Sequence, residues 1–264
     1  PPSVVSRLKG RGCEVSVSPD LKGDSLAEAL RELNPEVLVV RSTKVNAEHL
    51  DAAPSLSLVV RAGAGVNTID LAAASSRGVY VSNCPGKNAV AVAELAWAHI
   101  LNADRRVADG VQDLREGQWK KKVYSKQARG IKGRTLGIVG FGAIGQAVAK
   151  RGQAFEMEIL AFDPALTEEA ASERGVRSMN SLVELAAESD VLTVHVGLNA
   201  HTRGLIGAEV INALKPGSIV VNTSRGPVVD EAALRKGVEE KGLRAGLDVF
   251  CEEPASDGPW EKDL

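Results

Sequence analysis

Aromatic residues make up only 3% of the 264 residues, and they do not alternate with basic side chains. A protein that stacks nucleic-acid bases needs aromatic side chains along a basic surface. Here 32 basic residues nearly balance 34 acidic ones, and the resulting net charge of −2 offers little attraction for a polyanion. We therefore expect no nucleic-acid partner.

Cysteine is also scarce: the three residues lie far apart and form no Cys-x-x-Cys pair. This spacing indicates neither a zinc knuckle nor a disulfide framework, so we expect no metal and a reducing compartment. No apolar run approaches the roughly 20 residues that span a bilayer, and no basic-then-apolar signal opens the chain. We expect a cytoplasmic protein without membrane association. These observations leave open an organellar targeting segment ahead of residue 1.

Short apolar segments alternate with helical patterns through most of the sequence. Such alternation predicts parallel strands joined by crossover helices, an α/β fold. We expect two domains, residues 1–88 and residues 89–264. The predicted strands are residues 13–18, 36–42, 56–63 and 79–83 in the first domain, then 135–140, 158–162, one near 176, 190–195, 218–222 and 244–249 in the second.

The predicted helices fill the intervals between these strands. One long helix, residues 89–116, opens the second domain, and the basic, turn-rich stretch 117–134 after it is predicted to be a loop. The other predicted helices begin near residue 1 or cover 24–33, 46–54, 67–78, 143–154 and 167–174, with one more before each of the last two strands.

The stretch TLGIVGFGAIGQAVAK, residues 135–150, places Gly140, Gly142 and Gly145 where a strand passes into a helix. A lone G-x-G-x-x-G is a weak signal, but here Asp163 follows 23 residues after the first glycine, at the end of the next strand. In this context the glycines allow a tight turn, close approach of a pyrophosphate, and close helix packing. The first-turn N–H groups, including those of Ala143 and Ile144, suit an anion.

The acidic side chain indicates which dinucleotide would bind. A carboxylate at Asp163 accepts hydrogen bonds from a ribose diol and repels a 2′-phosphate. The sequence therefore predicts NAD as the cofactor, in preference to NADP. An ordinary tight strand–helix turn is the alternative interpretation.

Two later predicted strands are each followed by polar residues at the carboxyl edge of the sheet. Ligands of open α/β folds bind at this edge. The first is followed by Thr223 and Arg225, and a guanidinium there can grip a carboxylate with two parallel hydrogen bonds. The second is followed by Asp248 and Glu253, which could bind a carboxamide or tune the pKa of a histidine. The alternatives are an arginine paired with an acidic neighbour and a solvated acidic turn.

The first domain carries basic residues at two strand ends. Arg41 and Lys44 follow one strand, while Arg61 and a glycine-rich turn follow the next. Backbone N–H groups of such a turn can bind a carboxylate. The pattern favours an anionic substrate, for example a phosphorylated one. The alternative is that these basic side chains are ordinary solvated surface charges.

These segments together resemble successive signatures of the D-isomer-specific 2-hydroxyacid dehydrogenases, in the right order and over essentially the whole chain. The similar stretches are RAGAGVNTID, NCPGKNAVAVAELA, GRTLGIVGFGAIGQAVAKR, LKPGSIVVNTSRGPVVDEAAL and AGLDVFCEEP. Within the family, VVRSTKV and GQWKKK are most similar to the D-3-phosphoglycerate dehydrogenases. The resemblance implies a flavodoxin-like substrate domain and a Rossmann NAD-binding domain, with dimerisation through the long helix into a homodimer or homotetramer.

The resemblance also implies an activity and roles for particular residues. The activity is NAD-dependent oxidation of a D-2-hydroxy acid to the 2-oxo acid, with 3-phosphoglycerate, at the entry to serine biosynthesis, as the expected substrate. Arg225 would be catalytic, and Glu253 would raise the pKa of a catalytic histidine. The implied cofactor residues are Gly140, Gly142, Ala143, Ile144, Gly145, Asp163, His195, Thr223 and Asp248, and the implied substrate residues are Arg41, Arg61, Ala64, Gly65 and Val66.

The sequence also departs from the family. None of its four histidines occupies the position of the catalytic histidine, which follows the Glu-Pro pair, and Gly197 stands where a proline is usual. We expect the substrate domain to be truncated at both ends. We also expect weak turnover without the catalytic histidine, because a general base is worth roughly 10²–10⁴-fold in rate. A hydroxypyruvate or glyoxylate reductase, and a non-catalytic NAD(H)-sensing protein similar to corepressors, remain alternative functions.

Overall fold

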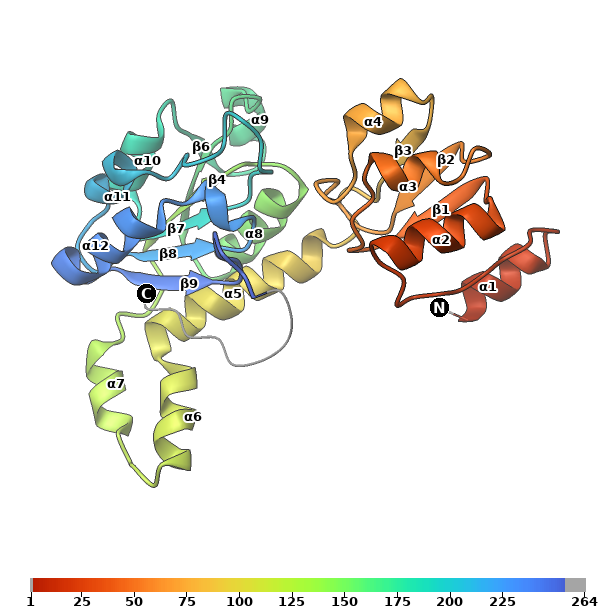
Figure 1. Ribbon diagram of the computed structural model, residues 1–264. Helices are drawn as coiled ribbons and strands as arrows, with labels where there is room; N and C mark the ends of the chain where they lie inside the picture. The colour runs from red at the N-terminus through yellow and green to blue at the C-terminus, as the bar shows by residue number, and fades with distance from the viewer. Residues whose placement is uncertain (1, 255–264) are drawn as a thin grey trace. The chain divides into compact units, whose positions relative to one another are not determined.

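The structure, a computed structural model, describes residues 2–254 (Figure 1). The chain divides into two compact units, with the boundary between Lys87 and Asn88. Each unit contains its own sheet, and within the described residues every strand pairing is parallel. The prediction of an α/β fold with parallel sheets is confirmed.

Unit 1 is a three-stranded sheet in the order β1-β2-β3. Apolar residues of its helices and strands, among them Leu26, Leu30, Leu50 and Val59, form one buried cluster. Its elements are α1 (Pro2–Lys9), α2 (Asp24–Leu33), β1 (Val37–Val40), α3 (Ala47–Asp51), β2 (Leu58–Arg61), α4 (Leu71–Ser76) and β3 (Tyr80–Ser82).

The prediction of a strand over residues 13–18 is wrong. This segment is irregular, and β1 pairs only with β2 among the described residues. Alternation of apolar and polar residues favours an extended chain, but a strand also needs a neighbour to share its hydrogen bonds. Val37 and Val39, which share one face of β1, are exposed.

Unit 2 contains a six-stranded sheet in the order β6-β5-β4-β7-β8-β9 (Figure 1). Numbered within the unit this is 3-2-1-4-5-6, the doubly wound order whose direction of winding reverses between β4 and β7. Ligands of such folds bind at the carboxyl ends of the strands beside that reversal. The strands are β4 (Thr135–Val139), β5 (Glu158–Phe162), β6 (Arg177–Ser178), β7 (Val191–Val194), β8 (Ile219–Asn222) and β9 (Arg244–Leu247).

Helices cover both faces of this sheet, which is why its central strands β4, β7 and β8 are buried at every position except Thr135. Leu136 and Ile138 of β4 belong to a cluster that includes residues of α5 and α8, whereas Val139 belongs to a second cluster that includes residues of α10, α11 and α12. The helices are α5 (Ala89–Arg105), α8 (Ala143–Ala154), α9 (Glu168–Ser172), α10 (Leu182–Glu188), α11 (Ala208–Ala213) and α12 (Glu231–Lys241).

The single long helix predicted over residues 89–116 is interrupted. Arg106 adopts left-handed backbone angles, φ 54° and ψ 45°, and separates α5 from α6 (Val107–Arg115). The side chain of Asn102 accepts a hydrogen bond from the N–H of Ala108, and Arg106 pairs with Asp109 at 2.6 Å. These side-chain bonds stabilise the break. The predicted loop over 117–134 is also wrong in part, because α7 (Lys121–Gln127) lies within it.

Together α6 and α7 form a hairpin that projects from the sheet (Figure 1). The buried carboxylate of Asp113 joins the two helices by accepting bonds from Lys120 at 2.8 Å and Tyr124 at 2.5 Å. At the base of the hairpin, Asp104 accepts bonds from the N–H groups of Arg129 and Gly130. Polar bonds therefore hold the hairpin together and fix it to unit 2.

Candidate functional site

The glycine turn between β4 and α8 lies beside the winding reversal, next to the end of β7. Gly140 has φ +90°, and its N–H donates to the carbonyl of Phe162 at 2.9 Å. A Cβ at Gly145 would lie 2.2 Å from the carbonyl oxygen of Gly140. The first glycine thus permits the left-handed turn, and the third permits close packing of α8 against it.

Gly142 has a different environment. It is the N-cap of α8, no side chain caps the helix, and a Cβ placed there would meet no atom within 4 Å. The first-turn N–H groups, including those of Ala143 and Ile144, therefore lack a capping side chain, and the space beside Gly142 is open. A helix N-terminus of this kind suits a phosphate group.

Asp163 follows β5 and contacts the glycine turn directly. Its Oδ2 accepts from the N–H of Phe141 at 2.8 Å, and its Oδ1 accepts from the N–H of Ala165 at 2.9 Å. Each carboxylate oxygen can accept a further bond. The acidic residue expected to contact a ribose therefore also supports the turn that would hold the pyrophosphate.

His195 and Thr223, both predicted cofactor residues, follow β7 and β8. The N–H of His195 donates to the carbonyl of Val139, and its Nε2 lies 2.9 Å from the hydroxyl of Thr193. Burial lowers the pKa of His195 to about 4, so its ring is neutral at physiological pH. The His195 Nδ1 and the Thr223 Oγ1 are buried without a hydrogen-bond partner in the described structure. Buried polar atoms of this kind call for an absent partner such as a ligand or water.

Arg225 lies in a tightly bonded turn after β8. The Asn222 side chain accepts from the N–H and hydroxyl of Ser224 and donates to the carbonyl of Arg225 at 3.0 Å. The guanidinium of Arg225 donates to the Ser224 carbonyl at 2.6 Å. Asn222 is 1% exposed, so the bonds that fix the backbone of Arg225 are shielded from water.

The segment after β9 packs against this turn. A Cβ at Gly226 would lie 2.0 Å from the backbone of Phe250, so only glycine allows the two chain segments to approach this closely. Glu253 accepts from the N–H of Phe250 at 3.2 Å, and the Asp248 N–H donates to the carbonyl of Asn222. The structure therefore brings the segments of Arg225, Asp248 and Glu253 together at one sheet edge.

The predicted substrate residues of unit 1 lie at the carboxyl edge of its own sheet. Arg61 ends β2, and a Cβ at Gly63 would lie 1.4 Å from the Arg61 Nη1, so the guanidinium covers the glycine. The Arg61 Nε is buried without a partner in the described structure. Asn83 donates to the Ala64 carbonyl at 2.7 Å and braces the turn that continues through Gly65 and Val66, whereas Arg41, just after β1, is exposed.

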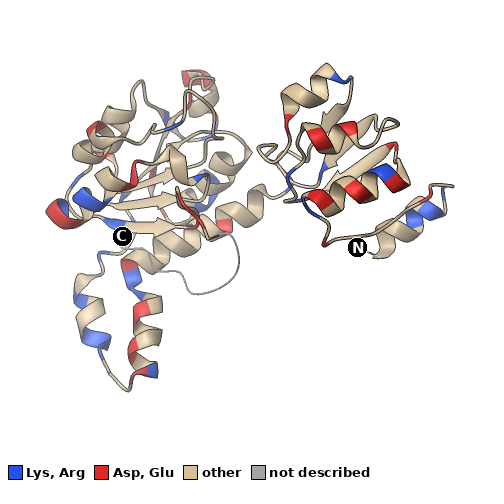
Figure 2. Cartoon of the chain, viewed as in Figure 1, with Lys and Arg blue, Asp and Glu red and all other residues tan. Residues whose placement is uncertain are grey.

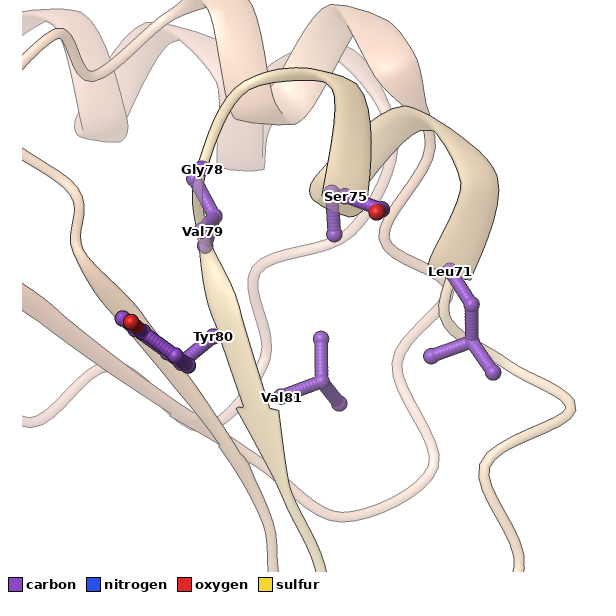
Figure 3. A pocket seen from close by; sticks show the side chains of 7 residues that line it. Leu71, Ser75, Gly78, Val79, Tyr80 and Val81 are labelled. Carbon is purple, nitrogen blue, oxygen red and sulfur yellow. The ribbon is translucent and has the colours of Figure 1, made fainter.

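The unit also contains an open hollow of about 340 Å³ between α4 and β3. Figure 3 shows Leu71, Ser75 and Tyr80 around it, and none of the predicted site residues contributes to its lining. Its wall is mainly apolar and bears no charged side chain. The hollow therefore lacks the groups that would bind an anionic substrate.

Sequence reasoning missed two residues that contribute to the site. The sequence predicts Asn222 only as the last residue of a strand, and Gln146 only as part of a helix. The Gln146 Nε2 donates to the Phe141 carbonyl at 3.0 Å, within the glycine turn. An asparagine directly before Thr-Ser-Arg, and a glutamine directly after the third glycine, are the only sequence signals for these roles.

The described part of the chain contains neither a candidate metal centre nor a candidate membrane span. No group of three or more His, Cys, Asp or Glu side chains within residues 2–254 is arranged to hold a metal ion. No helix in this range has both the length and the apolar character that crossing a bilayer requires.

Comparison with known proteins identifies the family. Residues 97–263 match the model of the D-isomer specific 2-hydroxyacid dehydrogenase NAD-binding domain. The chain belongs to the D-isomer-specific 2-hydroxyacid dehydrogenase family, and unit 2 contains its NAD-binding domain. The resemblance inferred from the motifs is confirmed.

Individual relatives carry different enzyme names. The chain is 40% identical to the D-3-phosphoglycerate dehydrogenase of Methanocaldococcus jannaschii over 250 residues, 93% of this chain and 47% of that protein. It is 43% identical to the hydroxypyruvate reductase of Thermotoga maritima over 242 residues, 91% of this chain and 76% of that protein. The chain thus spans about half the length of the phosphoglycerate dehydrogenases that it matches.

A solved structure supports the cofactor. The NAD-dependent formate dehydrogenase of Staphylococcus aureus, solved in complex with NAD, superposes with a TM-score of 0.82 at 31% identity, covering 96% of this chain and 76% of that one. The glycine turn, the uncapped N-terminus of α8 and Asp163 fit a dinucleotide. NAD is the cofactor of this domain.

Proposed function

We propose that this chain is the catalytic part of an NAD-dependent dehydrogenase that oxidises 3-phosphoglycerate to 3-phosphohydroxypyruvate, the entry reaction of serine biosynthesis. The observation that carries the proposal is the position of Arg225. Its backbone is fixed by Asn222 at the same sheet edge as the glycine turn. A cation held beside a dinucleotide site can bind and orient the carboxylate of a 2-hydroxy acid.

The residues at this edge have distinct roles in the proposal. The Arg225 guanidinium binds the substrate carboxylate and stabilises charge on the reacting oxygen. Asp248 binds the carboxamide of the nicotinamide, and Glu253 raises the pKa of a histidine that exchanges the proton of the substrate hydroxyl. Bound at the glycine turn, NAD would supply the acceptor for the hydride that leaves C2 of the substrate.

His195 is not proposed as that general base. Its ring is largely buried, its Nε2 is within hydrogen-bond distance of Thr193, and burial holds its pKa at about 4. A base effective near pH 7 needs a pKa close to that value. We assign His195 instead to the wall of the nucleotide site, beside Gly140.

The choice of 3-phosphoglycerate depends on the basic residues of unit 1 and on the names of relatives. Arg41 and Arg61 are proposed to bind the phosphate, and the turn of Ala64, Gly65 and Val66 to bind the carboxylate. The chain is similar to several D-3-phosphoglycerate dehydrogenases at 40–42% identity. The second candidate is a hydroxypyruvate or glyoxylate reductase, since the Thermotoga maritima relative is matched over 76% of its length.

We also propose that the chain forms a homodimer, or a homotetramer built from dimers, through the α6–α7 hairpin. The interior of the hairpin is polar, since Asp113 bonds Lys120 and Tyr124 there. Its apolar side chains point outward: Val107, Val111, Leu114, Trp119 and Val123 are 44–76% exposed. Figure 2 shows that both helices of the hairpin also carry charged residues. An exposed apolar patch with a polar rim is typical of protein–protein interfaces.

The proposed activity is tested by NADH oxidation, using the natural gene product against 3-phosphohydroxypyruvate, hydroxypyruvate and glyoxylate. We expect strong preference for the phosphorylated acid. Turnover only with the unphosphorylated acids would favour the second candidate. NADH binding without turnover of any 2-oxo acid would contradict both and favour an NAD(H)-sensing protein.

The phosphate assignment has its own test. Arg41→Ala should weaken the binding of 3-phosphohydroxypyruvate much more than the binding of hydroxypyruvate, because only the former carries a phosphate. Arg31→Ala, an exposed arginine on α2, is the matched control. Equal losses for both acids would show that Arg41 does not bind the phosphate.

A further inference from the structure

Both backbone polar groups of Phe141 are hydrogen-bonded to side chains. The N–H of Phe141 donates to the Asp163 Oδ2 at 2.8 Å, and the carbonyl of Phe141 accepts from the Gln146 Nε2 at 3.0 Å. The Phe141 ring is itself buried, with 5% exposed. The residue between the first two glycines of the turn is therefore fixed at both backbone groups and at its side chain.

These bonds also determine which backbone groups stay available. Gln146 bonds the Phe141 carbonyl and Asp163 bonds the Phe141 N–H, so both backbone groups of Phe141 are occupied, whereas no side chain caps the first turn of α8. Gln146 is well placed for this role because it lies in the second turn of the same helix. The helix and its preceding turn are thus bonded as one piece.

We propose that Gln146 is a positioning residue for NAD: with Asp163 it clamps the Phe141 peptide, so that the glycine turn is already shaped for the pyrophosphate before the nucleotide arrives. Preorganisation improves affinity because less conformational freedom is lost on binding. Gln146 does not itself contact the nucleotide in this proposal. The inference concerns the NAD-binding domain and is independent of the substrate.

The helix supplies a matched control. Gln153, near the other end of α8, is exposed like Gln146 and donates from its side chain to backbone carbonyls of Arg174 and Gly175. Gln153→Ala removes the same kind of bond from the same helix, far along the helix from the glycine turn. A general loss of α8 stability would appear in both variants, whereas a positioning role belongs to Gln146 alone.

The test measures binding of NADH and of ADP-ribose by calorimetry, with Gln146→Ala and with Gln146→Met, which keeps the side-chain length. Loss of one net hydrogen bond predicts roughly three- to tenfold weaker binding of both ligands. The melting temperature should match that of Gln153→Ala, whose nucleotide affinity should equal that of the native chain. In nucleotide-free protein, the hydrogen-bonded backbone amides of Gly140 and Phe141 should exchange faster with solvent deuterium in the Gln146 variants only.

Two results would overturn the proposal. Native affinity in both Gln146 variants would show that the bond to Phe141 does not prepare the turn. Weaker binding with unchanged exchange of the Gly140 and Phe141 amides would assign Gln146 to a direct contact with the nucleotide. Because both ligands lack a 2-oxo acid, failure here would leave the proposed dehydrogenase activity standing.

Discussion

The buried side chain of Asn222 holds the backbone of Arg225, with its Nδ2 3.0 Å from the Arg225 carbonyl oxygen. The Asn222 Oδ1 simultaneously accepts from Ser224, so one amide organises the whole turn at the end of β8. The arginine assigned to the substrate thus depends on a residue that need not touch the substrate. Precise placement of such a group can govern rate, since misplacement by about 1 Å costs on the order of 100-fold.

The first prediction concerns this turn. Asn222→Asp keeps the shape of the side chain but removes the donor to the Arg225 carbonyl. We expect kcat/KM for the 2-oxo acid to fall by roughly 10–100-fold while the Kd for NADH stays within about twofold. Steady-state kinetics and calorimetry measure the two quantities. A proportionate loss of NADH binding would show that Asn222 supports the nucleotide instead of Arg225.

The second prediction separates two glycines of one motif. Gly142→Ala places a methyl group where no protein atom lies within 4 Å, so the fold should be unaffected. The methyl group would occupy space needed by the pyrophosphate, and NADH binding should weaken by about tenfold or more. Chemical denaturation and calorimetry measure stability and binding, and a Gly142→Ala protein that binds NADH normally would contradict the pyrophosphate assignment.

Gly145→Ala is the matched comparison. Its Cβ would lie 2.2 Å from the Gly140 carbonyl oxygen, so α8 must move away from the turn. We expect a loss of about 1–3 kcal/mol in the free energy of unfolding. Equal stability of the two variants would mean that α8 does not pack as closely as described.

The success of sequence reasoning at this motif has a local cause. The bounds predicted for α8 and β5 agree with the structure because strand, glycines and helix follow one another within a few residues. The helix break at Arg106 could not be predicted in this way, because the residue has ordinary helix propensity. The break after α5 is stabilised by Asn102 and Asp109. Side-chain bonds of this kind leave no periodic signal.

The candidate site likewise contains residues whose positions the sequence predicts and residues whose positions it does not. The positions of Arg225 and Asp248 at one sheet edge could be predicted because both residues follow apolar strands. Asn222 could not, since its position reads as the last residue of a buried strand and its role depends on how the next three residues fold back. The strand expected over 13–18 failed because pairing requires a neighbour, which alternation alone cannot specify.

The third prediction concerns acid stability. Burial lowers the pKa of His195 to about 4, below the unfolded value near 6.5. The unfolded chain therefore binds the proton more tightly, and the stabilisation from His195 is complete above about pH 6.5 and is lost as the pH falls towards 4. The loss amounts to about 3 kcal/mol at most.

Urea unfolding at pH 7 and pH 4.5 measures this effect. His195→Gln, which keeps a nitrogen near the Nε2 position, should lose less stability between pH 7 and pH 4.5 than the native chain does. His201→Gln, at an exposed histidine, should behave as the native chain does. Identical pH dependence of the native chain and the His195 variant would show that the ring is accessible to protons when folded.

The fourth prediction concerns assembly. Leu114→Lys places a charge in the exposed apolar face of the α6–α7 hairpin, where Leu114 is 58% exposed, and burying that charge in an interface would be costly. Analytical ultracentrifugation should show a shift towards monomer. Val17→Lys, at an equally exposed apolar residue of unit 1, should leave assembly unchanged. If Leu114→Lys keeps the native sedimentation coefficient, the hairpin is not the interface.

The most direct test of the proposed function is the effect of Arg225→Gln on turnover and on nucleotide binding in the same preparation of the natural gene product. We predict that kcat/KM for the preferred 2-oxo acid falls by roughly 1,000-fold or more, while the Kd for NADH stays within about twofold, because the guanidinium binds the substrate carboxylate and not the nucleotide. Arg203→Gln, at an exposed arginine of the same unit, should match the native protein in both. Native turnover in Arg225→Gln would contradict the account.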